Sequence, residues 1–364
     1  RDYSMVDVFK EAAVYPVVFL VVNDKPKNAF VKTKVMTNLI DVMTSNTIES
    51  KTFYSDVFWD KYFFDKKILD IVIRITLNRR LSSVFTGIFG SATVNEAYQI
   101  KEVIENLKNQ EDYFKLINTG TIDPYKSLWG IKNTQYIKAS YEKPIIKAAA
   151  LKRINPERLK QSSAPKIIIA GMSLRIEAVF DKGEYCAGKS TAIIIGESPE
   201  LKTLTGILNS RVVSFWFSKY FNSLSMAGGY FNIGTNEIGL IPIPNKMEFP
   251  LWQIAHTVDY LSNNNLSSNY IVFFDSLMNA MVYQLYFPDE IKSAGGDVLK
   301  HLADLPELKD SWGDEKKLAV IEKVYKDLSS PAHPVSIAMA KMQEVPEVKI
   351  IEGRGKEQKE VASV

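Results

Sequence analysis

The chain has 364 residues, of which 46% are hydrophobic and 24% charged, and its formal net charge is +3. This composition is typical of an ordinary globular protein with roughly two or three domains. A single cysteine, Cys186, excludes an internal disulfide and favours a reducing cytoplasm, and three scattered histidines exclude a zinc cluster of the usual Cys/His kind.

The ends of the chain and its apolar runs bear on its location. No apolar run approaches the roughly 20 residues that a membrane helix needs, and the chain has no signal peptide, so we expect a cytoplasmic protein without a membrane partner. The chain starts at Arg1 without a methionine, and we expect it to be part of a longer protein.

The first 35 residues are predicted to be rich in strands. Residues 17–22 form a continuous apolar run, typical of a strand buried on both faces, and residues 30–35 resume an extended alternation after a turn. Residues 36–80 mix a short helix with aromatic segments.

The middle of the chain alternates helices and strands. Thr93 and Glu96 form a capping box that predicts a helix to about residue 109. Strands are predicted at 114–118, 166–170, 174–180 and 191–195. Ser198 is predicted as the N-cap of a long amphipathic helix, with Pro199 at its first position, running to about residue 217.

The C-terminal part, residues 250–345, has helical periodicity almost throughout, and a charged tail follows from residue 351. The sequence therefore predicts an α+β fold in which a mixed β-sheet domain with packed helices precedes a mostly helical C-terminal subdomain.

The charge is unevenly distributed. Residues 131–230 hold 15 Lys and Arg against 7 Asp and Glu, a net charge of +8, whereas residues 251–364 hold 12 against 17, a net charge of −5. A basic middle segment indicates contact with nucleic acid, and the alternative is a set of lysines that only solvate the surface.

Two motifs resemble catalytic or nucleotide sites. Residues 183–190 match the phosphate-binding pattern G-x-x-x-x-G-K-[ST], but a strand pattern rather than a helix follows Ser190, so the loop is predicted to join two antiparallel strands and to expose Lys189. Asp181, Glu200 and Lys202 could be read as a nuclease metal site, but Glu200 lies at a helix start, where an acid complements the dipole. We identify no catalytic residues and no metal ligands in this chain.

Segment 206–244 is the most unusual part of the sequence. The apolar face of its helix is predicted to be core, while the loop that follows contains Gly228 and Gly229, which would let the backbone approach a partner closely. Lys219, Asn222, Ser223 and Asn232 have side chains suited to phosphate and base-edge contacts. DNA contact and a tightly packed turn both remain open for this loop.

The same segment resembles a known family. The Leu208-Asn209-Ser210 helix, the aromatic run from Phe215, the Gly228-Gly229 loop and the exit at 241–244 resemble the TaqI-like C-terminal specificity domain, the target-recognition part of adenine-N6 DNA methyltransferases. These include fused type IIG restriction-modification enzymes and phage-exclusion methyltransferases. Further stretches fit the family in order: 8–16, 117–123, 128–130, 165–177, 188–191 and 282–286.

This resemblance implies a domain organisation. Residues 1–78 would be the C-terminal edge of a methyltransferase core, 79–246 the target-recognition domain, 247–350 the helical subdomain and 351–364 a flexible tail. The S-adenosylmethionine loop and the Asn-Pro-Pro catalytic motif of the family are missing from this sequence and would lie upstream of Arg1. The chain would then bind no cofactor and would not methylate DNA by itself.

The resemblance also implies partners and site residues. The chain would bind double-stranded DNA sequence-specifically and position it for base flipping by the methyltransferase domain of the same polypeptide. The residues expected to contact DNA are Lys166, Arg175, Lys189, Ser190, Arg211, Lys219, Asn222, Ser223, Gly228, Gly229, Tyr230 and Asn232. Two alternatives are a specificity subunit of a type I-like restriction system and a protein-interaction module that does not bind DNA.

Overall fold

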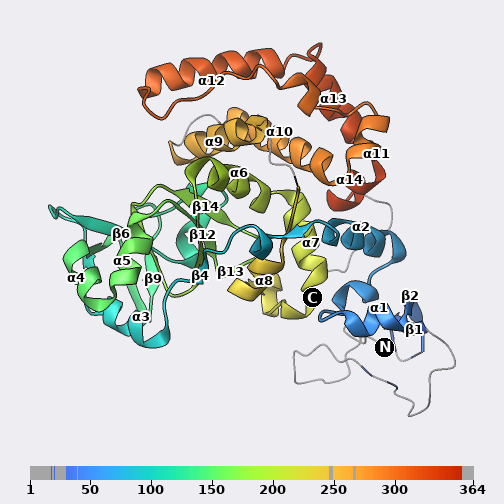
Figure 1. Ribbon diagram of the computed structural model, residues 1–364, viewed down its shortest axis with the longest axis horizontal. Helices are drawn as coiled ribbons and strands as arrows, with labels where there is room; N and C mark the ends of the chain where they lie inside the picture. The colour runs from blue at the N-terminus through green and yellow to red at the C-terminus, as the bar shows by residue number, and fades with distance from the viewer. Residues whose placement is uncertain are drawn as a thin grey trace. The chain divides into compact units, whose positions relative to one another are not determined.

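The computed structural model describes residues 30–38, 40–245, 249–264 and 268–354, together with Val18 and Leu20. The chain divides into two compact units (Figure 1): unit 1 comprises Arg1–Leu77 and Phe215–Phe231, and unit 2 comprises Asn78–Ser214 and Asn232–Val364. The predicted strand at 17–22 and the tail from residue 355 lie largely outside the described residues. The predicted domain boundaries stay predictions.

Unit 1 is built on a hairpin and an aromatic cluster. The antiparallel strands β1 (Phe30–Met36) and β2 (Val42–Glu49) precede α1 (Ser50–Ser55), the 3₁₀ turn η1 (Asp60–Phe63) and α2 (Lys66–Thr76). The extended alternation predicted at 30–35 is thus confirmed. Phe53 stacks on Trp59 with ring centroids 4.6 Å apart, and Thr33 and Asn46 donate hydrogen bonds to the carbonyl of Tyr62.

Unit 2 contains two four-stranded sheets, with strand orders β14-β12-β16-β4 and β15-β6-β11-β5. In the first, β12 is fully buried and pairs antiparallel with β14 and β16; in the second, β15 runs parallel to β6. The strands of unit 2 are β3 (Arg79–Arg80), β4 (Ile88–Gly90), β5 (Glu105–Asn106), β6 (Tyr113–Ile117), β7 (Ile122–Asp123), β8 (Lys126–Ser127), β9 (Thr134–Tyr136), β10 (Ala139–Tyr141), β11 (Pro144–Lys147), β12 (Lys166–Ala170), β13 (Met172–Ser173), β14 (Ala178–Asp181), β15 (Tyr185–Ala187), β16 (Thr191–Ile195) and β18 (Pro242–Ile243), and β17 (Phe231–Asn232) lies at the boundary with unit 1.

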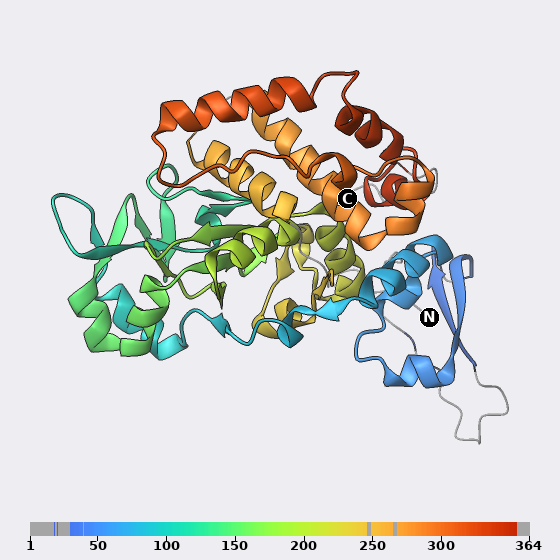
Figure 2. The ribbon, with the colours of Figure 1, turned by 45° about the horizontal axis from the view of Figure 1, so that its top comes forward.

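Helices accompany the sheets and then make up most of the C-terminal region. In Figures 1 and 2, α12 lies alongside α10. The helices are α3 (Val94–Lys101), α4 (Ala148–Ile154), α5 (Pro156–Ser163), α6 (Ser198–Leu208), α7 (Arg211–Tyr220), α8 (Thr235–Leu240), α9 (Phe249–Asn263), α10 (Ser268–Tyr286), α11 (Pro288–Ser293), α12 (Asp314–Leu328), α13 (Pro334–Met342) and α14 (Pro346–Ile351). The prediction of an α+β fold with a mostly helical C-terminal region is confirmed.

The helix predicted at 93–109 is shorter than expected. The Thr93 hydroxyl accepts from the amide of Glu96 as a cap, but the Glu96 carboxylate pairs with Arg158 (Nε–Oε1 2.9 Å) instead of returning to Thr93. The helix ends at Lys101, and β5 then pairs with β11. Strand pairing between distant segments therefore overrides the local helical periodicity.

The long helix predicted at 198–217 is in fact two helices, α6 and α7, and Glu197 rather than Ser198 is the N-cap of the first. At the break, Asn209 uses its side chain to bind the backbone of Ala178 in β14, donating one hydrogen bond and accepting another, each 2.9 Å long. The strand predicted at 174–180 likewise begins only at Ala178. Ser210 then accepts a hydrogen bond from the amide of Val213 in the first turn of α7.

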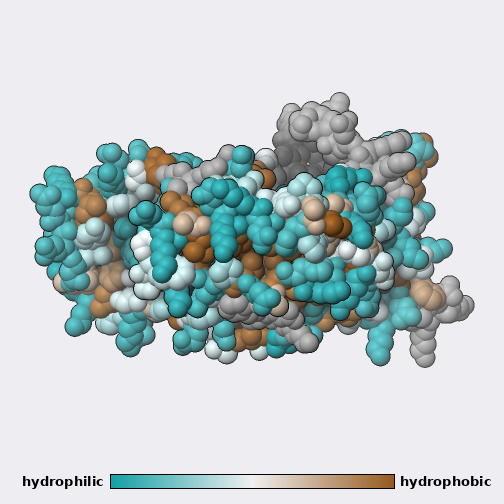
Figure 3. Space-filling model, turned by 90° about the horizontal axis from the view of Figure 1, so that it is seen from above, coloured by the Kyte–Doolittle hydropathy of each residue, from teal (hydrophilic) through white to brown (hydrophobic). Residues whose placement is uncertain are grey.

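Three further features bear on known kinds of site: surface hydropathy, helix length and groups of possible metal ligands. On the face drawn in Figure 3, hydrophobic residues are interspersed among hydrophilic ones. Within the described ranges, no helix is long and apolar enough to cross a membrane. The described residues also contain no group of three or more His, Cys, Asp and Glu side chains arranged to hold a metal ion.

Candidate functional site

Three loops of unit 2 meet where β6 and β12 end and β16 begins. We call residues 118–120, 171–174 and 188–190 the loop edge. The amide of Gly171 donates to the carbonyl of Ser190 (2.9 Å), and the amide of Ser190 donates to Asn118 Oδ1 (3.1 Å). Thr119 Oγ1 accepts from the amide of Met172 (3.0 Å) and lies 2.9 Å from its carbonyl oxygen. These bonds fix the three loops relative to one another.

Two glycines make this close approach feasible. A Cβ atom on Gly171 would lie 2.6 Å from the carbonyl oxygen of Ser190, and one on Gly188 would lie 2.8 Å from Asn118 Oδ1. Both distances are shorter than real Cβ contacts allow, so glycine is required there by packing. The close approach at Gly171 is therefore one between loops of this chain.

The loop edge presents polar, cationic and apolar side chains together. Lys189 and Ser190 are exposed, and Lys189 makes no ion pair with any residue that the structure describes. Met172 and Leu174 are 47% and 56% exposed. Asn232 is also exposed and lies beside this edge, because the amide of its neighbour Ile233 donates to the carbonyl of Gly171 (2.9 Å).

The loop at 183–190 does not have the structure of a nucleotide-binding loop. β16 follows Ser190 directly, as predicted, so the loop amides do not open a helix that could hold phosphates. The loop also does not join paired strands: β15 pairs with β6 in one sheet, while β16 pairs with β12 and β4 in the other. The loop therefore connects two sheets, and the exposure of Lys189 is confirmed.

Lys166 does not suit the phosphate contact predicted for it. Its side chain is 1% exposed, and Nζ lies 2.5 Å from the equally buried Asp181 carboxylate while donating to the carbonyl of Ser162 (2.8 Å). Asp181 in turn accepts from the amides of the turn at 183–185. Lys166 is thus a structural residue that joins β12, β14 and the end of α5.

Arg175 and Arg211, both predicted to contact DNA, line a cavity of unit 2 with a volume of about 660 Å³. Arg175 is exposed at its rim, whereas Arg211 is held by Glu352 (Nη1–Oε1 2.6 Å) in the turn after α14. Burial, with the negative charge of Asp123, raises the pKa of Glu177 in the same cavity to about 7. Arg211 is therefore engaged within the chain, and Arg175 is free to meet a partner.

The remaining predicted residues belong to unit 1. Lys219 is half-buried with its ammonium 4.7 Å from the Phe64 ring centroid, and burial lowers its pKa. Asn222 and Ser223 are exposed, and Ser223 donates to Asp60 (2.8 Å). Gly228 and Gly229 have φ angles of 82° and 77°, which favour glycine.

The Gly228-Gly229 loop closes on itself. The amide of Met226 donates to the carbonyl of Tyr230 (2.8 Å), and the amide of Gly229 donates to the carbonyl of Met226 (2.9 Å). The loop is therefore a tight turn, and it leaves Tyr230 45% exposed. A contact between this exposed ring and DNA stays a prediction.

Comparison with known proteins gives the family of the central segment. Residues 115–243 match the sequence model of the TaqI-like C-terminal specificity domain. This segment is a TaqI-like C-terminal specificity domain. A solved structure with similarity to the chain is that of the type IIL restriction-modification enzyme MmeI in complex with DNA, with a TM-score of 0.28 and 11% sequence identity over 68% of this chain. The chain covers 34% of that protein's length. No curated protein matches the chain.

The loop edge lies entirely within the specificity domain, and it contains two residues that the sequence analysis did not select. Asn118 and Thr119 hold the other two loops through their side chains. Their signal in the sequence is a polar Asn-Thr-Gly turn placed directly after the buried end of a strand. The contacts of this turn link residues more than fifty positions apart.

Proposed function

We propose that this chain is a sequence-specific double-stranded DNA recognition module of an adenine-N6 DNA methyltransferase in a restriction-modification system. The observation that carries the proposal is the loop edge: three hydrogen-bonded loops of a TaqI-like specificity domain that together present an unpaired cation, hydroxyl groups and exposed apolar side chains. Such a combination suits DNA, because phosphates take cations and base edges take hydrogen bonds and apolar contacts.

Each part of the loop edge has a role in this proposal. Lys189 would neutralise a phosphate, Ser190 would face base edges or sugar oxygens, and Met172 would contact a thymine methyl group. A rigid edge limits the conformational entropy that binding would otherwise cost. Arg175 and Asn232 would extend the contact on either side.

The reaction would be completed by another domain of the same polypeptide. Methylation of adenine requires the base to be rotated out of the duplex, and unstacking costs a few kcal/mol. A recognition module that holds the flanking duplex offsets this cost. The S-adenosylmethionine site and the catalytic residues would belong to the methyltransferase domain, in keeping with a cytoplasmic type IIG enzyme.

The first prediction concerns the charge of Lys189. We expect Lys189→Glu to weaken binding of a mixed-sequence duplex at least about tenfold at about 50 mM salt, and to lower the slope of log K against log salt by about 0.9 for each phosphate that the chain no longer neutralises. Fluorescence anisotropy at about 50 and about 200 mM salt measures both quantities.

A matched variant separates this contact from the effect of overall charge. Lys323 is an exposed lysine of α12, in the helical C-terminal region, and Lys323→Glu changes the net charge by the same amount. We expect it to leave duplex binding nearly unchanged. Equal losses of affinity in the two variants, or binding of the unaltered chain that does not respond to salt, would contradict the proposal and favour a protein-interaction module.

A further inference from the structure

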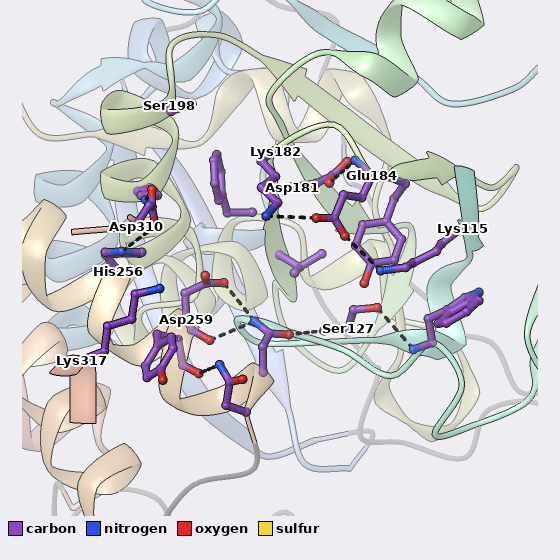
Figure 4. Close-up of a pocket in the computed structure, with 18 of the residues that line it drawn as sticks. Lys115, Ser127, Asp181, Lys182, Glu184, Ser198, His256, Asp259, Asp310 and Lys317 are labelled. Carbon is purple, nitrogen blue, oxygen red and sulfur yellow. Dashed lines mark hydrogen bonds and ion pairs between the residues drawn. The ribbon is translucent and has the colours of Figure 1, made fainter. Parts of the chain in front are cut away.

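Unit 2 contains a polar cavity of about 460 Å³ that the proposed DNA contact does not use (Figure 4). Its walls are the strands β14 and β15, the start of α6, the helix α9, and a loop that leads into α12. Figure 4 shows Asp310 next to His256 on one side, with Lys317 and Asp259 nearby, and Glu184 across the cavity between Lys182 and Lys115.

Lys202 is a buried cation of the cavity, and it pairs with the exposed carboxylate of Asp310. The Lys202 side chain is 6% exposed, and its Nζ donates to Asp310 Oδ2 at 3.1 Å, but the Asp310 side chain is 75% exposed. An ammonium has three N–H donors, and Asp310 is the acceptor that the structure gives to Lys202. A buried cation therefore depends on one carboxylate of an exposed loop.

His256 is likewise a buried side chain next to the exposed Asp310 carboxylate. The residue is 5% exposed, its Nε2 lies 3.1 Å from Asp310 Oδ1, and neither ring nitrogen makes a well-aligned hydrogen bond. Buried polar groups are normally hydrogen-bonded, so an imidazole left in this state at a cavity wall is suited to an incoming acceptor or donor.

The other groups near Asp310 also favour an anion. Lys317 projects from α12 with its ammonium over the Tyr260 ring (5.1 Å), without an ion-pair partner in the described part of the chain. Burial raises the pKa of Asp259 to about 7, so near neutral pH this carboxyl repels an anion less than an ordinary aspartate would. Across the cavity, Glu184 is already neutralised by Lys115 and Lys182.

We propose that this cavity binds a phosphate group, which takes the place of the Asp310 carboxylate between Lys202, His256 and Lys317. A phosphate offers more acceptor oxygens and more negative charge than a carboxylate, so it can satisfy donors that Asp310 leaves unused. Asp310 is exposed and can move into water when the phosphate enters. The inference does not depend on the proposed DNA recognition, and the phosphate could be free or part of a DNA backbone.

The test measures inorganic phosphate binding to the full chain by isothermal titration. We expect Asp310→Ala to bind phosphate at least about tenfold more tightly than the unaltered chain, because the competing carboxylate is gone. Adding Lys202→Met to this variant should abolish the binding. Asp304→Ala removes the same charge from an exposed position of the same loop and should have no effect.

A parallel measurement of duplex DNA binding identifies the source of the phosphate. If the phosphate belongs to DNA, Asp310→Ala will also bind a mixed-sequence duplex more tightly, and inorganic phosphate will compete; if it belongs to a small molecule, duplex affinity will not change. Asp310→Asn, which keeps the side-chain volume, replaces Asp310→Ala if the latter lacks the circular dichroism spectrum of the folded chain. The proposal is overturned if the folded variant binds neither phosphate nor duplex more tightly, or if Asp304→Ala has the same effect.

Discussion

At the scale of single residues, the fold changes the pKa of Asp259. It lies on α9, accepts a hydrogen bond from Asn263 (3.2 Å) and has its pKa raised to about 7 by burial, with Lys202 opposing the rise and Asp310 adding to it. Nearby, burial and the charge of Lys202 lower the pKa of His256 to about 4. Both groups are thus driven toward their neutral forms by the same cause.

The shift at Asp259 predicts a pH-dependent stability. Between its ordinary pKa of 3.8 and about 7, the folded chain keeps a proton that the unfolded chain releases, so the free energy of unfolding falls as pH rises through this window. Asn cannot ionise, and its amide oxygen can still accept from Asn263. We expect Asp259→Asn to be more stable than the unaltered chain at pH above this window, by about 1 kcal/mol or more.

Denaturant unfolding at the two ends of the window measures this difference. The gain of Asp259→Asn should shrink toward zero as pH approaches the ordinary pKa, because both proteins are then neutral at this position. A gain that is the same at both ends would mean that the Asp259 carboxyl is not held neutral by the fold. His256 has the opposite sign, since its lowered pKa reduces stability as pH falls below its usual value of 6.5.

At the scale of elements, the loop edge depends on contacts between segments that are far apart in the chain. β12 is buried on both faces, so the loop after it starts at a fixed point, and Gly171 then binds Ser190 through its backbone. Asn209, directly after α6, likewise binds the backbone of β14 through its side chain. Gly171 allows a backbone hydrogen bond between two loops, and Asn209 forms side-chain hydrogen bonds between the end of α6 and β14.

A pair of glycine substitutions tests this account of the loop edge. Gly171→Ala would place a Cβ 2.6 Å from a backbone oxygen, whereas nothing lies within 4 Å of a Cβ added to Gly120 in the same edge. We expect Gly171→Ala to lower stability by about 1–3 kcal/mol, as overpacking does, and to weaken duplex binding. Gly120→Ala should change stability by less than about 0.5 kcal/mol. Thermal unfolding compares the two, and equal effects would show that the edge tolerates movement at Gly171.

At the scale of the whole molecule, unit 1 is assembled from two separate stretches of chain. Phe221 and Trp216 of the later stretch are almost fully buried. Phe221 packs edge-on against Phe58 (4.7 Å between centroids), and Trp216 donates a hydrogen bond to Thr76 (2.8 Å). Described residues within 30–77 therefore form a core with a segment of the specificity domain itself.

This arrangement predicts the outcome of a truncation. A chain that begins at residue 78 would lack Phe58, which packs against Phe221, and Thr76, which accepts from Trp216. Apolar surface would be exposed, and burial of such surface contributes about 25 cal/mol per Å². We expect this chain to bind the dye ANS and to aggregate, while a chain that begins at residue 30 keeps the described partners and does neither. A monomeric, dye-free chain from residue 78 would show that Phe215–Phe231 needs no partner from unit 1.

Local patterns predicted much of the secondary structure but less of the site. Strands at 166–170 and 191–195 and the helices of the C-terminal region follow from apolar periodicity, which needs no knowledge of neighbours. Apolar periodicity does not show that Lys166 is buried and Lys189 exposed, because both are lysines of the same basic segment. Only the fold shows that the first is paired with Asp181 inside the protein.

The sequence alone determined the α+β class, the TaqI-like specificity family and the exposure of Lys189, since each follows from patterns of neighbouring residues. The tertiary structure decided which charges are free. Lys166, Lys202 and Arg211 count among the fifteen cations of residues 131–230, but each forms an ion pair, with Asp181, Asp310 and Glu352 respectively. Asp310 and Glu352 lie more than one hundred residues away in the chain. Charge pairing depends on distance in space, and a count along the sequence does not contain it.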